Sequence, residues 1–545
     1  MTKAVQARGE MRSGEGGVRQ RMAGLHTWAG LLLGWVLYAM FLTGTVSYFK
    51  DELSQWMRPE LPALTQQLDQ ATTAQRVADE LGRLVPDASM WSIKLPDAHS
   101  NSVYAFWRNS DRQAPRGGFG EGIFDPHSGA RFAARGTLGG DFFYRFHFQF
   151  YYMSPLWGRW LAGVAAMFML IAIIAGVITH KKIFTDFFTF RWGKGQRSWL
   201  DAHNALSVFG LPFHLMITYT GLVTLMALYF PWGEQTALKT PAERQQLAVE
   251  LSAFGAMPSK PSGQRAPLAS IAEMVRQAEA RWGEGSVGRV NAALPGDAGA
   301  RIAVTRGDTG RVSISPVYLE FEGSTGRLLA VHDHVGAAAE TRGVLYALHL
   351  GRFGDIETRW LYFLVSFMGT AMVGTGLVMW TVKRRQKLAD PERPHFGFRV
   401  VERLNIASIA GLSVAMTSFL WANRLLPHPM PSRAEWEIHV FFIVWALTLI
   451  YALLRPVRAA WVELLAAAAV LLALLPVLNA LTTARPLWHS VAVGDWVFAG
   501  VDLMCWALAA LHGVLAFRVA RRGRVTPLEN PRRFAPIALD AAERV

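Results

Sequence analysis

Long apolar runs alternate with charged segments along this chain of 545 residues. Runs of this kind are long enough to cross a hydrocarbon core of ~30 Å, which a helix does in about 20 residues. The eighth run contains one acidic residue, Asp502, which we expect to face protein or water rather than lipid. The predicted membrane-spanning helices lie at about residues 24–49, 160–180, 203–230, 360–382, 404–423, 438–454, 464–484 and 496–517.

Two longer stretches, residues 50–146 and 231–345, interrupt the apolar runs with a different pattern. Each begins with a helical pattern (TTAQRVADELGRLV and SIAEMVRQAEARW) and continues with short strand-like segments such as SVYAFW and VYLEFE. Each ends in a similar hairpin, FDPHSGARFA in the first and FEGSTGRLLA in the second. We therefore predict two small α+β modules outside the bilayer, on a membrane protein that is otherwise mainly α-helical.

The order of spans and modules occurs twice. The first span begins at His26 and the third at His203, and each reaches a Thr-Gly pair at the same separation. The second and fourth spans both begin with Arg-Trp-Leu and carry a glycine in register. Residues 24–182 and 201–385 are therefore two copies of a span–module–span unit, arranged as a parallel repeat. The matched anchors are His26 with His203, Gly44 with Gly221, Arg159 with Arg359, and Gly176 with Gly376.

The charge pattern indicates how the chain crosses the membrane. The formal net charge is +14, and Lys and Arg gather in segments that alternating spans place on one side. This distribution predicts that both termini are cytoplasmic, and it does not point to nucleic-acid binding. The first span lacks a small-residue cleavage site, so we expect it to be retained as an anchor. The remaining segments are the N-terminal tail (1–23), a basic connector (183–200), a second connector (386–403), a C-terminal four-helix membrane region (404–520) and the C-terminal tail (521–545).

Four histidines follow the repeat. His26 and His203 begin matched spans, and His147 and His349 precede the second and fourth spans at nearly matched positions. If the two units pack around a pseudo-twofold axis, each pair faces across the bundle, with one pair near each side of the membrane. Two imidazoles on opposite sides of a flat macrocycle are the axial ligands of a b-type haem. Cys505 is the only cysteine, which excludes disulfides, cysteine-ligated iron–sulfur clusters and CxxCH haem attachment.

Two further histidines, His180 and His214, have no histidine counterpart in the other copy. His180 could replace His26 as the partner of His203, and His214 could ligate a more central haem; both could instead be neighbours of the ligands. Zinc or copper could also bind paired histidines, although carboxylate and thiolate co-ligands are scarce. A single histidine at a helix end is more often an anchor or a cap. The aromatic run Phe142–Tyr152 is typical of an interfacial belt, and it could also shield the outer haem edge and conduct electrons to a docked acceptor.

Motifs around the spans resemble those of the PepSY-associated transmembrane proteins, over residues about 22–386. These motifs are a span that begins with His and has Thr-Gly near its outer end, and LHLGRFG (348–354) before RWLYFL (359–364). The resemblance implies periplasmic PepSY-like modules above a haem-bearing four-helix bundle in the bacterial inner membrane, as in di-haem ferric-siderophore reductases. It implies two b-type haems, whose ligands would be His26, His147, His203 and His349.

The resemblance further implies an oxidoreductase that carries electrons across the membrane to Fe(III) in a siderophore docked between the modules, which releases Fe(II) for uptake. The cytoplasmic segments contain no GxGxxG fingerprint, so the donor would be quinol or a separate cytosolic reductase. The four C-terminal spans depart from the family pattern; whether they bind quinol, recruit a partner or stabilise the bundle is open. Two other functions also stay open: a haem-free PepSY sensor or regulatory interaction protein, and an iron-chelate transporter, which the scarcity of intramembrane acidic residues disfavours.

Overall fold

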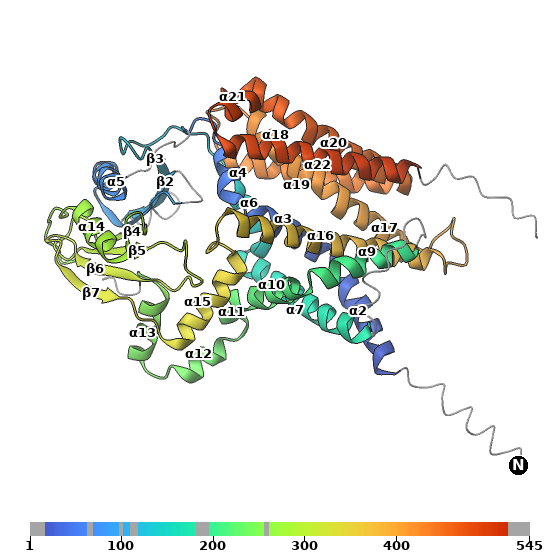
Figure 1. The fold of residues 1–545 in the computed structure, drawn as a ribbon, viewed down its shortest axis with the longest axis horizontal. Helices are drawn as coiled ribbons and strands as arrows, with labels where there is room; N and C mark the ends of the chain where they lie inside the picture. Colours follow the sequence, from blue (N-terminus) through green and yellow to red (C-terminus); the bar gives the residue numbers. More distant parts are fainter. Residues whose placement is uncertain are drawn as a thin grey trace, which may run out of the picture.

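The computed structural model of the protein describes residues 17–62, 69–97, 102–109, 118–180, 196–254 and 261–521. Most of the predicted basic connector and most of the two predicted tails lie outside these residues. The described part contains a seven-stranded sheet at one end and a large group of membrane helices at the other (Figure 1).

Six helical stretches are long and apolar enough to cross a membrane, and eight if each of two bent helix pairs counts as one span. The chain is therefore a multi-pass membrane protein, as the apolar runs predict. The six continuous stretches are α7 (Pro155–Thr179), α16 (Ile356–Arg385), α17 with the π-helix η2 and α18 (Phe396–Ile406, Ala407–Gly411 and Leu412–Leu425), α19 (Arg433–Leu454), α20 (Val457–Thr482) and α22 (Trp496–Arg521).

The two bent pairs are the first span of each repeat unit. Helices α2 (Val18–Leu32) and α3 (Gly34–Ser47) meet at 66°, and α9 (Gln196–Phe209) and α10 (Leu211–Thr224) meet at 68°. The apolar runs predict one span at 24–49 and one at 203–230, and the structure bends each of them sharply. The breaks fall at matched positions, Leu33 and Gly210. In the second copy Pro212 stands in the first turn after the break, where its missing N–H is tolerated.

The two predicted modules share one antiparallel sheet, with the strand order β3-β2-β1-β4-β5-β6-β7. Strand β1 of the first module pairs with β4 of the second, and Ser92 lies opposite Asn291 at the centre of this pairing. The sequence predicts two small modules; the structure joins them edge to edge. The strands are β1 (Ala88–Lys94), β2 (Val103–Asn109), β3 (Phe119–Phe124), β4 (Val287–Ala293), β5 (Arg301–Arg306), β6 (Tyr318–Glu322) and β7 (Leu328–His332).

Helices α5 (Gln70–Leu84) and α14 (Ile271–Trp282) pack against each other on one side of this sheet (Figure 1). Alternate residues of the strands point to that side, and they form one apolar core with both helices, to which Trp91 and Val290 contribute from the two central strands. A single core across both modules makes them one folded body. Several shorter helices complete the chain: α4 (Lys50–Trp56), α6 (Gly140–Gln149), α11 (Met226–Tyr229), α12 (Pro231–Ala237), α13 (Pro241–Leu251), α15 (Ala337–Leu350) and α21 (Leu487–Ala492).

Within the membrane part, α16 packs against α9 and α3, and α7 packs against α2 and α10, so the four spans of the two repeat units form one bundle. The C-terminal helices lie beside this bundle (Figure 1). Helix α6 contacts them through aromatic rings: the centroid of Phe142 lies 4.6 Å from that of Phe419 and 5.0 Å from that of Phe441. Phe142, Phe143 and Phe146 are buried. The prediction of an interfacial belt is therefore wrong for these residues, which join α6 to the C-terminal region.

Candidate functional site

The structure brings four histidines together in the two pairs that the repeat predicts. His147 on α6 and His349 on α15 form the sheet-side pair, with ring centroids 6.2 Å apart. His26 on α2 and His203 on α9 form the far-side pair, also with centroids 6.2 Å apart. Each pair takes one ring from each repeat unit, as a pseudo-twofold arrangement of the units requires.

Each of the four rings is held by a backbone carbonyl at Nδ1. In the far-side pair, His26 Nδ1 lies 2.7 Å from the oxygen of Ala172 and His203 Nδ1 lies 2.9 Å from that of Met372. A carbonyl oxygen can only accept a hydrogen bond, so Nδ1 carries the proton. Nε2 is then the unprotonated nitrogen, with a lone pair available to a metal.

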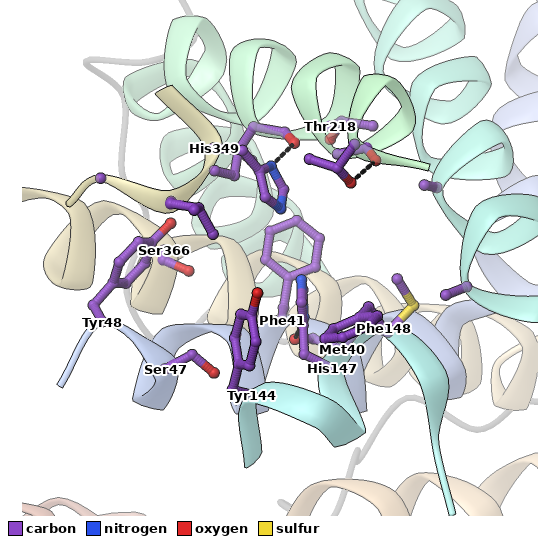
Figure 2. Close-up of a pocket in the computed structure, with 18 of the residues that line it drawn as sticks. Met40, Phe41, Ser47, Tyr48, Tyr144, His147, Phe148, Thr218, His349 and Ser366 are labelled. Carbon is purple, nitrogen blue, oxygen red and sulfur yellow. Dashed lines mark hydrogen bonds between the residues drawn. The ribbon is translucent and has the colours of Figure 1, made fainter. Parts of the chain in front are cut away.

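The sheet-side pair repeats this arrangement. His147 Nδ1 lies 2.7 Å from the oxygen of Met40, and His349 Nδ1 lies 3.0 Å from that of Ile217 (Figure 2). The carbonyls come from matched positions of the first span in each copy. A second partner that fixes the tautomer and orientation of an imidazole is typical of metal-ligating histidines.

A glycine faces each of these rings. A Cβ added to Gly44 would lie 2.8 Å from the His147 ring, and one added to Gly221 would lie 2.9 Å from the His349 ring. The corresponding distances to His26 and His203 are both 3.2 Å, from Gly176 and Gly376. All four glycines are anchors of the sequence repeat. Their repetition therefore reflects the space that the imidazoles need next to a helix.

A cavity of about 290 Å³ lies at the sheet-side pair. Its walls are mostly apolar and include the small side chains of Ala162 and Ala166; Phe41 lies beside both rings (Figure 2). At its mouth the lining becomes polar and charged. We refer to the following residues as the mouth: Tyr48, Lys50, Asp51, Tyr144, Tyr346 and Arg352.

Ion pairs connect the mouth across the two repeat units. The carboxylate of Asp51 lies 2.8 Å from Lys50 Nζ and 3.0 Å from a guanidinium nitrogen of Arg352. Burial alone would raise the pKa of Asp51, but Lys50, Lys94 and Arg352 outweigh this effect and lower it. Lys94 is at the end of β1, so the charged mouth also faces the central strands of the sheet.

The imidazoles of the sheet-side pair are neutral at physiological pH. Burial lowers the pKa of His147, and it lowers the pKa of His349 to about 3, with the neighbouring His147 adding to the second shift. Within the described residues, no group of three or more His, Cys, Asp or Glu side chains is arranged to hold a metal ion. A zinc or copper site at these pairs would therefore lack its usual co-ligands there.

His180 and His214 belong to neither pair. His180 ends α7, where its backbone N–H lies 3.2 Å from the oxygen of Gly176, and it is His26 whose ring faces His203. The His214 side chain is only 1% exposed, and its ring contacts are with Phe41 and Phe213. His26 is the ring that faces His203, whereas the roles of His180 as an alternative partner of His203 and of His214 as a ligand of a more central haem stay predictions.

Comparison with known proteins gives a family match and one relative. The model of the PepSY-associated transmembrane region matches residues 23–383, which includes both repeat units and ends before the C-terminal spans. An uncharacterized protein of Pseudomonas aeruginosa is 25% identical over 313 residues, which cover 55% of this chain and 76% of that protein. Because the family match extends over more than half of its length, the chain belongs to the PepSY-associated transmembrane family.

Proposed function

We propose that each histidine pair holds one b-type haem and that the protein carries electrons across the bacterial inner membrane to reduce ferric iron in a siderophore. One observation carries the proposal. Metal–imidazole bonds of about 2 Å on opposite sides of one ion place the two ring centroids about 6 Å apart. Both pairs have a separation of 6.2 Å.

The surroundings of the pairs also fit a haem. The Nδ1 contacts to carbonyls leave all four Nε2 atoms unprotonated, and the glycines provide the space that the rings need. The largely apolar cavity at the sheet-side pair suits a flat apolar macrocycle. When bound, haem would supply the reversible uptake of one electron at each side of the bundle. The chain's own part is to hold the two imidazoles of each pair, to exclude water from them and to bring the two sites into one bundle.

The mouth of the sheet-side cavity is where we place the electron acceptor. Because β1 and β4 pair along their length, they leave no gap between the two modules in which a chelate could dock. It would instead approach below the joined sheet, where Lys50 and Arg352 line the cavity and Lys94 is near. One electron converts Fe(III) to Fe(II), which hard oxygen ligands hold less tightly, so the iron is released. In this proposal the sheet is periplasmic, both termini are cytoplasmic, and quinol or a separate reductase donates the electrons.

An absorption spectrum of the purified protein tests the proposal. We expect protein from haem-replete cells to show a Soret band that shifts with dithionite, sharp α bands and close to two haems per chain by pyridine haemochromogen. A colourless preparation would contradict it and would favour the haem-free sensor or the chelate transporter.

Alanine variants then assign the ligands. His147→Ala and His349→Ala should each remove the same one of the two spectra, and His26→Ala and His203→Ala should each remove the other. His127→Ala is the matched control, because His127 is an exposed histidine of the first module. It should keep both haems. Loss of the same haem in His26→Ala and His349→Ala would contradict the pairing.

A further inference from the structure

The two repeat units differ at His214, which corresponds to Leu37 in the first copy. Both positions lie 11 residues after a histidine of the far-side pair, and both side chains are buried, at 1% and 3% exposure. The four paired histidines obey the repeat, and each faces a second ring. Packing alone does not call for an imidazole here, because leucine occupies the matched position.

Helix α16 shows the depth at which His214 lies. Gly376 faces the ring of His203 in the far-side pair, and Ser366 lines the sheet-side cavity. Gly369 lies between them; a Cβ added there would be 2.7 Å from the Phe41 ring and 3.1 Å from His214 Nε2. Seven residues of helix separate Gly369 from Gly376, which is about 10 Å along the axis. The imidazole therefore lies between the levels of the two pairs.

His214 also contacts the surroundings of the sheet-side pair. Its ring centroid lies 6.3 Å from that of Phe41, which lines the cavity. Three residues further along α10, the carbonyl of Ile217 accepts the hydrogen bond from His349 Nδ1. The contacts of His214 thus reach the residues that surround the sheet-side pair.

The polar atoms of His214 are poorly satisfied. Nδ1 has no hydrogen-bond partner among the described residues, and Nε2 is 3.4 Å from the carbonyl oxygen of Val365. An unsatisfied buried polar group is destabilising, and leucine would avoid this cost. A buried group of this kind calls for an explanation other than stability.

We propose that His214 is a positioning residue for electron transfer, which makes the two haem sites electrostatically unequal. This inference rests on the proposed function. The imidazole puts a dipole at a position where the first repeat unit has the apolar side chain of Leu37, and polar surroundings stabilise the charged ferric state relative to the ferrous state. The nearby haem therefore has a lower midpoint potential with His214 than it would have with leucine.

The test compares midpoint potentials of the full-length protein in detergent. His214→Leu should keep two haems per chain, and one of the two midpoints should rise. We expect at least a tenfold change in the ratio of reduced to oxidised haem at a fixed potential, which is about 59 mV for one electron. His214→Asn, which keeps a polar group, should restore part of the difference. Phe213→Leu, an apolar exchange beside the imidazole, is the matched control and should leave both midpoints unchanged.

Each outcome decides between the hypotheses. Two haems with unchanged midpoints in His214→Leu would overturn the inference, and loss of one haem would overturn it by making His214 a ligand. A colourless wild-type protein would instead reject the proposed function itself. If His214→Leu does not fold, Leu37→His decides: an added imidazole at the matched position should lower one midpoint, and unchanged midpoints would overturn the inference.

Discussion

The repeat bundle and the C-terminal region both enclose polar side chains, but they satisfy the hydrogen bonds of these side chains differently. In the bundle, each of the four paired imidazoles uses one nitrogen for a carbonyl and leaves the other for a ligand. In the C-terminal region the polar groups satisfy one another. The carboxylate of Asp502, which is fully buried, accepts hydrogen bonds from Trp56 Nε1 and Asn479 Nδ2, both at 3.1 Å.

Arg424 completes this C-terminal network. Its guanidinium lies 2.9 Å from Asn479 Oδ1 and 2.7 Å from the carbonyl oxygen of Trp56, and it stacks over the Trp56 ring. Trp56 belongs to α4 of the first repeat unit, so the network joins the two regions. A polar network whose groups are all hydrogen-bonded to one another, here called saturated, stabilises one arrangement. A site whose side chains keep an unused donor or acceptor, here called half-satisfied, can still bind a ligand. The difference favours a stabilising role for the C-terminal spans, among the roles that the sequence leaves open.

The largest effect should come from removing the cation of the saturated network. Arg424→Met removes the donors to Asn479 Oδ1 and to the carbonyl oxygen of Trp56, and it takes away the cation near Asp502. Removing one member of a buried ionic network costs about 3–5 kcal/mol. We expect a large drop in the thermal unfolding temperature in detergent. Arg455→Met, which breaks the exposed pair with Glu463, is the control and should change little. An Arg424→Met protein as stable as the wild type would show that the network does not hold the regions together.

The second effect tests the half-satisfied site. Gly44→Ala places a methyl group 2.8 Å from His147, whereas Gly376→Ala places one 3.2 Å from His203. We expect the haem content of Gly44→Ala to fall by about half, because the sheet-side ring must move, and Gly376→Ala to keep both haems with a shifted spectrum. Gly30→Ala has open space around the new methyl group and should behave like wild type. Equal haem content in all three variants would show that the glycines are not needed to make room for the histidine rings.

Much of this site could be predicted from the sequence, because the repeat itself carries the information. Matched positions identify the four paired histidines and the glycines that face them. The burial of Asp502 follows from the cost of a carboxylate in lipid, and the structure confirms it. The spans themselves follow from length and hydropathy.

Other features are not readable from residue types alone. The strand β1 has no sequence signal for its partner β4, since a buried apolar strand can pair with any similar edge. The bend at Leu33 has no proline beside it, unlike the one at Gly210, where Pro212 could have indicated it. The rings around Phe142 have the same composition whether they face lipid headgroups or another helix. Only tertiary contacts decide among such alternatives.

The third-largest effect should come from the ion pairs at the mouth, whose charged groups are all paired but lie near water. The folded protein holds the pKa of Asp51 below its usual value, so the carboxylate contributes stability above about pH 4 and loses that contribution as the pH falls further. Thermal unfolding between pH 7 and pH 3 should show this loss. Asp51→Asn should weaken the dependence, and Asp79→Asn, at an exposed carboxylate on α5, should not. An unchanged pH profile in Asp51→Asn would show that the mouth pairs do not contribute.

The smallest effect should come from a saturated pair without charge. At the junction of the two modules, Ser92 Oγ donates to Asn291 Oδ1 at 2.7 Å, and both side chains are buried. Asn291→Ala leaves this hydroxyl without its acceptor, which costs about 1 kcal/mol. Thr325→Ala, at an exposed turn, is the control for a lost surface hydrogen bond. A lower unfolding temperature in Asn291→Ala alone would support one cooperative sheet. If Asn291→Ala unfolds at the wild-type temperature, the hydrogen bond at the junction does not stabilise the protein. The sheet is then two modules in contact, and its polar pairs do not join parts of the molecule as the network around Asp502 does.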